Sequence, residues 1–576
     1  MQTPFFHIEI PTQAQDHKIL ANILPGADSL AVSEIAAQFN GLTVVVTNDT
    51  RSAVRLEKEL AQLSPLNVTF FPDWETLPYD SFSPHQDIIS ARLSALFHLQ
   101  QRKQGIFILP IATLMQRVCP PSYLQHRVLL INKGDRFVIE TLRLQLEKSG
   151  YRAVEQVLEH GEYAVRGALL DLFPMGSAVP FRLDFFDDEI DSIRTFDVDT
   201  QRTLQEIDQI NLLPAHEFPT DSLGIEFFRS QFRAAFGEIR RDPEHIYQQI
   251  SKGTLAAGIE YWQPLFFEEM ATLFDYFPAN TLFITGEQNQ TQGERFYADA
   301  EQRFESRRVD PMRPLLSPDK LWLRIDEVNR QLKNYPAIAL KTEKVRSSAR
   351  QKNLAITPLP PLTIQSQQKE PLHQLRQFVE HFKGNILFIV ETEGRRETLL
   401  SLLAPLKLKP KQIHTLAQAT EEKLALMVSP LEHGFIIEQD VPLAIICESE
   451  LLGERVQQRQ RDKSRTVNPD TLIRNLAELQ IGQPVVHLDH GVGRYGGLVS
   501  LENGGIKAEY LLLNYANDSK LYVPVASLHL ISRYVGGADE TAPLHKLGSE
   551  AWGKARSKAA EKIRDIKSYN KKIKTA

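Results

Sequence analysis

The sequence predicts a multi-domain α/β protein that carries a small all-β module near its end. Two separate stretches alternate short apolar runs with helical patterns, which is typical of parallel sheets covered by helices. A third stretch, 482–534, has short strands separated by turn residues over about 55 residues, as in an SH3-like or Tudor-like barrel. The length of 576 residues allows several domains at roughly 100–200 residues each.

The first α/β stretch is interrupted by a segment of different character. Its strands and helix are expected at 42–47, 105–110 and 51–63, and apolar strands of this kind are buried on both faces of a sheet. From about Pro120, runs such as 181–186 alternate with period two, so we predict an α+β insert. A helical pattern returns near Asn211 and continues to about Leu340.

The second half of the chain contains a further α/β unit with strands expected at 385–390 and 443–447 and a helix at 393–403. A polar, proline-containing linker precedes this unit and a charged segment follows it. The predicted division is 1–120 and 213–340 for the split α/β domain, 121–212 for its insert, 341–369 for the linker, 370–455 for the small α/β domain, 456–478 for the charged linker, 479–546 for the β-module and 547–576 for a basic helix.

Composition excludes several classes of protein. The net charge is -6, so the chain lacks the overall basic character of many nucleic-acid-binding proteins. Its two cysteines, Cys119 and Cys447, lie far apart, which argues against a thiolate zinc site and a disulfide framework. We find no leader peptide and no apolar stretch near the roughly 20 residues that a membrane helix needs, so we expect a cytoplasmic protein without membrane contact.

No segment carries the residues that a common class of enzyme requires. The run 548–555 is close to a phosphate-binding loop, but Ala555 stands where Ser or Thr would hold Mg²⁺. The acidic run 187–189 follows an apolar strand, as in a magnesium-binding motif, and we interpret it as a hairpin turn. His487 and His490 lie on a strand and turn, where a structural role is expected. We predict no catalytic residue, no metal and no cofactor.

Several long motifs resemble those of one bacterial family. They are Asp73-Trp74-Glu75-Thr76-Leu77-Pro78-Tyr79-Asp80 with the following 81–85, the run 161–174 from Gly161 to Pro174, Gly482-Gln483-Pro484-Val485-Val486-His487, the run 489–495, and Lys520-Leu521-Tyr522-Val523-Pro524. Together they resemble the transcription-repair coupling factors (Mfd), and the resemblance runs from near the start to about Asp565.

The resemblance implies a first module similar to the excinuclease subunit UvrB, split around an insert that binds the excinuclease subunit UvrA. The residues that match this binding surface are Arg166, Arg182 and Phe186. Arginine and aromatic side chains dominate the energetics of many interfaces, which agrees with such a role. The alternative is that both arginines only pair with neighbouring acids such as Asp184.

The same resemblance implies a nucleotide site that has lost its chemistry. Where UvrB has its phosphate-binding loop, this sequence has 24–31, which includes Gly26 and Ser29 but no Gly-Lys-Ser/Thr. Where UvrB has a magnesium-holding Asp, this sequence has Gly286 followed by Glu287. ATP and Mg²⁺ would belong to the motor of the intact family, which follows this part of the family's sequence, whereas this chain stops at Ala576.

The β-module resembles the RNA-polymerase-interacting domain shared with CarD-type regulators. In that family an edge strand pairs with the polymerase β subunit, and the matching region here surrounds Leu498, Val499 and Leu501. An exposed apolar edge strand is normally avoided unless it is used. The alternative is that these side chains fill the core of the barrel, which only one face of the strand can do.

The leading hypothesis is an adaptor that connects stalled RNA polymerase to UvrA and does not hydrolyse nucleotide itself. A second hypothesis is an active DNA-stimulated ATPase, which requires a phosphate-binding loop that the sequence lacks. A third is nucleic-acid binding through the basic tail, where nine Lys/Arg occur from Glu550 to Ala576. For the tail we favour a solvated linker helix that contacts a neighbouring domain.

Overall fold

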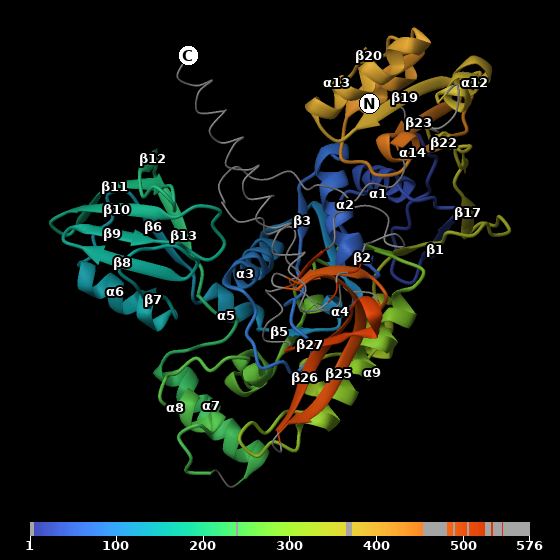
Figure 1. Cartoon of the computed structure of the whole chain (residues 1–576). Helices are drawn as coiled ribbons and strands as arrows, with labels where there is room; N and C mark the ends of the chain where they lie inside the picture. The colour runs from blue at the N-terminus through green and yellow to red at the C-terminus, as the bar shows by residue number, and fades with distance from the viewer. Residues whose placement is uncertain are drawn as a thin grey trace. The chain divides into compact units, whose positions relative to one another are not determined.

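The computed structural model describes residues 5–237, 240–364, 371–452, 481–487, 490–503, 506–524, 531–533, 544 and 546. The chain divides into two compact units, 1–453 and 454–576 (Figure 1).

A seven-stranded parallel sheet forms the centre of the first unit, in the order β17-β1-β16-β15-β2-β4-β3. Its strands are β1 (His17–Ala21), β2 (Leu42–Thr47), β3 (Val68–Phe70), β4 (Gly105–Pro110), β15 (Thr281–Thr285), β16 (Ala337–Leu340) and β17 (Gln351–Asn353). The strands β2 and β4 are those expected from the sequence, and every residue of both is buried. The prediction of a helical region from Asn211 to Leu340 is wrong in part, because strands β15 and β16 lie within this region and belong to the sheet.

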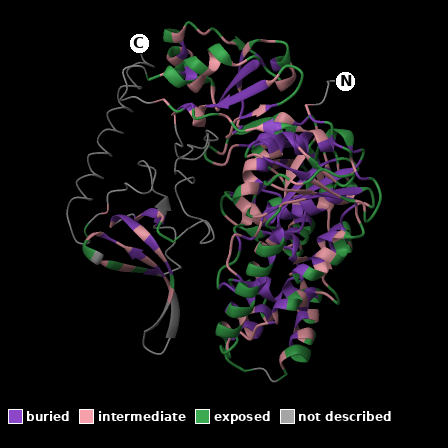
Figure 2. Cartoon of the chain, turned by 90° about the vertical axis from the view of Figure 1, so that its right-hand side faces the viewer, coloured by how far each residue is buried: buried purple, intermediate pink, exposed green. Residues whose placement is uncertain are grey.

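Helices cover the sheet and expose their outer faces, whereas the central strands β2, β4 and β15 are almost entirely buried (Figure 2). The helices of the split domain are α1 (Ala27–Gln38), α2 (Thr50–Leu63), α3 (Gln86–Gln101), α4 (Ile111–Leu114), α5 (Pro121–Gln125), α7 (Ser222–Phe236), α8 (Ile246–Ser251), α9 (Asn289–Arg307), α10 (Pro318–Leu321), α11 (Ile325–Leu332) and the 3₁₀ helices η1 (Ile259–Phe266) and η2 (Leu273–Asp275). The expected helix 51–63 is α2, and it begins where the Asp49 side chain accepts a hydrogen bond from the Ser52 amide. Two short strands, β5 (Arg117–Val118) and β14 (Ala271–Thr272), pair apart from the main sheet.

The insert forms its own mixed sheet in the order β12-β11-β10-β9-β8-β7. Its strands are β7 (Arg152–Ala153), β8 (Glu162–Arg166), β9 (Leu169–Leu172), β10 (Phe181–Phe186), β11 (Glu189–Phe196) and β12 (Thr203–Ile207), and a second pair is formed by β6 (Leu129–Asn132) and β13 (Gln209–Leu212). Helix α6 (Ile139–Lys148) packs Leu142 and Leu146 into the same core. Strand β10 alternates in burial as the period-two pattern of 181–186 predicts.

The small α/β domain has a six-stranded sheet in the order β18-β22-β23-β19-β21-β20. Its elements are β18 (Ile356–Thr357), α12 (His373–His381), β19 (Asn385–Val390), α13 (Glu393–Leu403), η3 (Ala404–Leu406), β20 (Lys411–Gln412), η4 (Leu416–Thr420), β21 (Leu424–Val428), β22 (Phe435–Ile437), β23 (Leu443–Cys447) and α14 (Glu448–Leu452). The strands and helix expected at 385–390, 443–447 and 393–403 are β19, β23 and α13. The predicted linker 341–369 is more ordered than expected, because it supplies β17 to the first sheet and β18 to this one.

The second unit contains a five-stranded antiparallel sheet in the order β27-β26-β25-β24-β28. Its elements are β24 (Pro484–His487), β25 (Gly491–Asn503), β26 (Ile506–Asn514), η7 (Ala516–Asp518), β27 (Lys520–Pro524) and β28 (Ile531–Arg533). Four of these strands agree with the expected all-β module, and β28, which the sequence pattern missed, returns to pair with β24. The charged linker 456–478 and the basic helix 547–576 lie outside the described residues.

Candidate functional site

The three residues predicted to contact UvrA lie on one face of the insert sheet. Arg182 and Phe186 are on β10 at positions of the same parity, and both point away from the core side chains that alternate with them. Arg166 on β8 is paired with Leu169 of β9, which is paired in turn with Asp184 of β10. Directly paired residues share a face of an antiparallel sheet, so the structure brings all three predicted residues to one surface.

The three side chains differ in how freely they can meet a partner. Phe186 is 79% exposed at the end of β10, so most of its ring is open to solvent. Arg166 is exposed, and its guanidinium donates to the Glu155 carbonyl at 2.6 Å. Arg182 is different because the fold itself uses it.

Arg182 forms a two-point ion pair with Asp171 across β9 and β10. Its Nε donates to Asp171 Oδ1 at 2.6 Å and its Nη2 to Oδ2 at 2.8 Å, and the guanidinium lies 5.0 Å from the centre of the Phe196 ring. The Asp171 side chain is almost completely buried. Arg182 therefore has an acidic partner, which is Asp171 and not Asp184 as the sequence suggested, whereas Arg166 donates to a backbone carbonyl.

The residues of the predicted degenerate nucleotide site occupy the carboxyl edge of the seven-stranded sheet. Gly26 precedes α1 with a φ of 84°, and the buried Ser29 donates its hydroxyl to the Gly26 carbonyl at 2.9 Å. Glu287 follows β15, and strand β16 lies between β15 and β1. The Glu287 carboxylate accepts hydrogen bonds from the Thr342 amide and hydroxyl at 3.2 and 2.9 Å, and these bonds lower the pKa of Glu287. Glu287 is thus bound to the loop after β16.

The positive end of helix α1 is already matched by a carboxylate. Asp28 lies in its first turn, where an anion is favoured by the helix dipole. Arg55 of α2 donates to this carboxylate from both of its terminal nitrogens, Nη1 and Nη2, and Nη1 also donates to Glu59 at 2.7 Å. A working phosphate site needs free amides and a cation at this position, whereas here the cation Arg55 is held by two acids.

The polymerase-binding prediction falls on β25, whose second half has one paired neighbour among the described residues. Strand β24 pairs with β25 only from Gly491 to Arg494, with backbone bonds continuing to Tyr495. A bulge follows at 496–497, where Gly497 has a φ of 103° and the register against β26 shifts. Among the described residues, only β26 pairs with β25 from 498 to 503.

This edge presents apolar side chains in its described part. Leu498 is 38% exposed and Val499 is half-buried. The backbone of Leu501 pairs with Ala508, and the Leu501 side chain lies outside the described residues. The core of this sheet is supplied by other residues, among them Val485, Tyr495, Leu511 and Leu513.

Other motifs weighed in the sequence have structural explanations or lie outside the described residues. The acidic run 187–189 is the turn between β10 and β11, as interpreted, and the near phosphate loop 548–555 is not described. In the described ranges no group of three or more His, Cys, Asp or Glu could hold a metal ion, and no helix there combines the length and apolar character of a membrane span. Cys119 and Cys447 are buried, and burial raises the pKa of both thiols.

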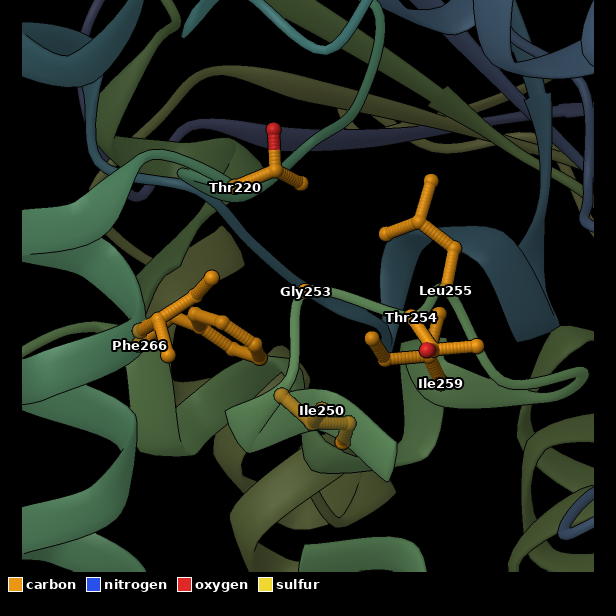
Figure 3. Close-up of a pocket in the computed structure, with 8 residues that line it drawn as sticks. Thr220, Ile250, Gly253, Thr254, Leu255, Ile259 and Phe266 are labelled. Carbon is orange, nitrogen blue, oxygen red and sulfur yellow. The ribbon is translucent and has the colours of Figure 1, made fainter. Parts of the chain in front are cut away.

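One small pocket lies beside α7, α8 and η1 (Figure 3). Its lining is mostly apolar and consists of Thr220, Ile225, Ile250, Gly253, Thr254, Leu255, Ile259 and Phe266. Its volume is about 10 Å³, which is room for one water molecule. The pocket is therefore too small to bind a substrate.

Sequence reasoning missed Asp171 and the pair formed by Arg55 with Asp28. Asp171 interrupts the apolar run 169–173, and a buried acid in a strand signals an arginine partner on the next strand. No comparable signal links Asp28 to Arg55, because 27 residues separate them.

Comparison with known proteins gives matches along most of the chain. Three family models match: the UvrB interaction domain at 129–218, the MFD D3 domain at 378–451 and the CarD-like/TRCF RID domain at 479–535. The chain is 78% identical to the transcription-repair-coupling factor of Haemophilus influenzae over 566 residues, which is 98% of this chain and 49% of that protein. It is 58% identical to that of Escherichia coli K12 over 97% of this chain and 49% of that protein. With that of Bacillus subtilis the identity is 26% over 95% of this chain and 48% of that protein. The chain spans about half the length of the curated relatives it matches.

Proposed function

We propose that this chain, which belongs to the transcription-repair-coupling factor family over nearly its whole length, connects RNA polymerase to nucleotide excision repair as an adaptor. The insert would bind UvrA and the β-module would bind the polymerase β subunit. Both partners work on bacterial DNA, so the proposal places the chain in the cytoplasm.

The observation that carries the UvrA proposal is the shared face of Arg166, Arg182 and Phe186 within the region that matches the UvrB interaction domain. An exposed aromatic side chain beside guanidinium groups has the composition of an interface hot spot. The paired Arg182 would contribute mainly by holding the sheet, and Phe186 and Arg166 would make the direct contacts.

The test is binding of purified UvrA to the immobilised chain. Phe186→Ala should weaken retention by at least tenfold, because hot-spot truncations remove about 2 kcal/mol or more. Leu223→Ala is the matched control, since Leu223 is 73% exposed on α7, outside the insert. Equal retention of the Phe186→Ala variant, the Leu223→Ala variant and the unchanged chain would reject the proposed surface.

For RNA polymerase we propose that the side of β25 from 498 to 503 that no described strand pairs with adds to a strand of the β subunit. Main-chain hydrogen bonds supply the affinity in this mode, and alternate side chains such as Leu498 supply the specificity. Leu498→Asp should abolish capture of polymerase while UvrA binding persists. Capture at unchanged affinity would reject this edge as the contact.

We further propose that this chain does not hydrolyse ATP. The support is the ion pair at the start of helix α1, where Asp28 in the first turn is bound to Arg55. DNA-stimulated ATP hydrolysis by the isolated chain would overturn this part of the proposal and favour the ATPase alternative. The binding tests above do not depend on it.

A further inference from the structure

The start of helix α1 is buried, although it lies at the edge of a parallel sheet where α/β proteins usually hold ligands. Ala27 and Ser29 have no exposed surface. The covering segment is 428–434, which runs from the last residue of β21 through the loop before β22 of the small α/β domain. We call it the docking segment.

The closest approach is between two backbones. A Cβ atom built on Gly26 would lie 2.4 Å from the backbone oxygen of His433, a distance that real Cβ atoms do not tolerate. Only glycine therefore fits at this position, both for space and because φ is 84°. The space in front of helix α1 is therefore filled by the His433 carbonyl oxygen of the same chain.

Polar contacts fix the docking segment to helix α2. Gln62 Nε2 donates to the Val428 carbonyl at 2.7 Å, at the start of the segment. The Glu432 amide donates to Glu59 Oε1 at a longer 3.4 Å, and Arg55 holds the other Glu59 oxygen. Glu59 is completely buried, and this burial raises its pKa.

The docking segment is also held from its own domain. Glu450 accepts hydrogen bonds from the Gly434 and Cys447 amides, both at 2.9 Å. The Ser449 hydroxyl donates to the Glu432 carbonyl at 2.5 Å. The segment therefore has a fixed shape supported on both sides.

Apolar packing joins the two domains around these contacts. Leu431 and Phe435 belong to the same buried cluster as Ala27 and Leu30 of α1. Nearby, the Asn22 side chain donates to the carbonyls of Leu354 and Ile356, both at 2.9 Å, where the chain passes from one sheet to the other. A continuous hydrophobic core of this kind indicates that the two α/β domains pack as one structural unit.

We propose that the docking segment is the resident occupant of the vacated nucleotide site, and that the small α/β domain serves to close this site and lock the two α/β sheets together. The charge around the site supports an occupant that is not a phosphate, because Asp28, Glu59 and Glu432 face a single Arg55. The proposal does not depend on binding of UvrA or RNA polymerase.

The test is hydrogen exchange of the full chain, read at the amides of Glu432 and Gly434. Gly26→Ala forces the docking segment away and should speed exchange there by roughly tenfold or more. Gly134→Ala is the matched control, since Gly134 has a φ of 86° but nothing within 4 Å of its added Cβ. Both variants carry the backbone strain, and only the first meets the docking segment.

Two further measurements complete the test. Gln62→Ala removes one contact from an exposed position and should speed exchange of the docking segment by about threefold, consistent with one lost hydrogen bond. Millimolar MgATP should leave the exchange of the unchanged chain as it is. Faster exchange with MgATP would show that nucleotide displaces the docking segment and would overturn the proposal. Unchanged exchange in Gln62→Ala would overturn the proposal as well in either of two cases. The first is that the two glycine variants exchange equally, and the second is that Gly26→Ala unfolds.

Discussion

Replacement of Arg182 by Ala should destabilise the insert, apart from any contact with UvrA that it removes. The substitution leaves the Asp171 carboxylate, which is 4% exposed, without the two hydrogen bonds that it accepts at 2.6 and 2.8 Å. It also removes the guanidinium that lies over Phe196.

The magnitude follows from burial. Removing one partner of a fully buried ion pair destabilises a protein by about 3–5 kcal/mol. Because 19% of the Arg182 side chain is exposed, water can reach the site after truncation, and we expect about 2–3 kcal/mol for the free energy of unfolding of the insert. The exposed Phe186 should contribute less than about 0.5 kcal/mol to the same quantity.

The assay is native-state hydrogen exchange at the amides of β9 and β10, combined with UvrA retention. Arg182→Ala should lose both protection and binding, whereas Phe186→Ala should lose binding alone. The double variant Asp171→Asn, Arg182→Met should recover much of the protection, because no unpaired charge remains. Unchanged protection in Arg182→Ala would refute the reasoning, since the ion pair would then contribute nothing to the sheet.

Three further predictions concern other parts of the chain. Burial raises the pKa of Glu260 to about 7, so the stability that Glu260 contributes should fall as pH rises from 4.5 to 7. Glu260→Gln should therefore give a melting temperature that depends less on pH and exceeds that of the unchanged chain at pH 8. An equal pH slope in both would contradict this. Arg92→Met should destabilise the split domain by about 3–5 kcal/mol in denaturant titration, because it leaves the buried Glu217 carboxylate without its ion-pair partner. A loss of stability below about 1 kcal/mol would contradict the importance of this ion pair. Gly497→Val should weaken polymerase capture, because a β-branched residue resists a φ of 103° and the bulge would shift; full capture would show that the bulge does not orient the edge.

The elements that the sequence predicted well are those decided by local pattern. Strands 42–47 and 385–390 are uninterrupted apolar runs, and helix 51–63 has an Asp49 cap before it. Strand β15 was missed because Thr281–Thr285 lies among helices in the sequence, and the strand β2 with which it pairs is far away along the chain. Strand β17 was missed for a related reason, since Gln351–Asn353 is polar and forms an edge.

The candidate sites were predictable to a different extent. Family motifs located Arg166, Arg182 and Phe186, and the alternation of β10 places two of them on one face. The partner of Arg182 required the register of β9 against β10, which the sequence does not encode locally. The cover over Gly26 could not be predicted at all, because His433 is over 400 residues away in the chain.

The pairing of β2 with β15 has a consequence for biosynthesis. During translation the chain emerges from its N-terminus, so β2 and β4 are complete long before β15 exists. About 170 residues separate the end of β4 from the start of β15, which at roughly 5–20 residues per second is a delay on the order of ten to thirty seconds. The insert, whose strands pair with one another, can fold within that interval. Until β15 arrives, one apolar edge of the nascent sheet is open to misassociation, and a chaperone acting at the ribosome would find its target there.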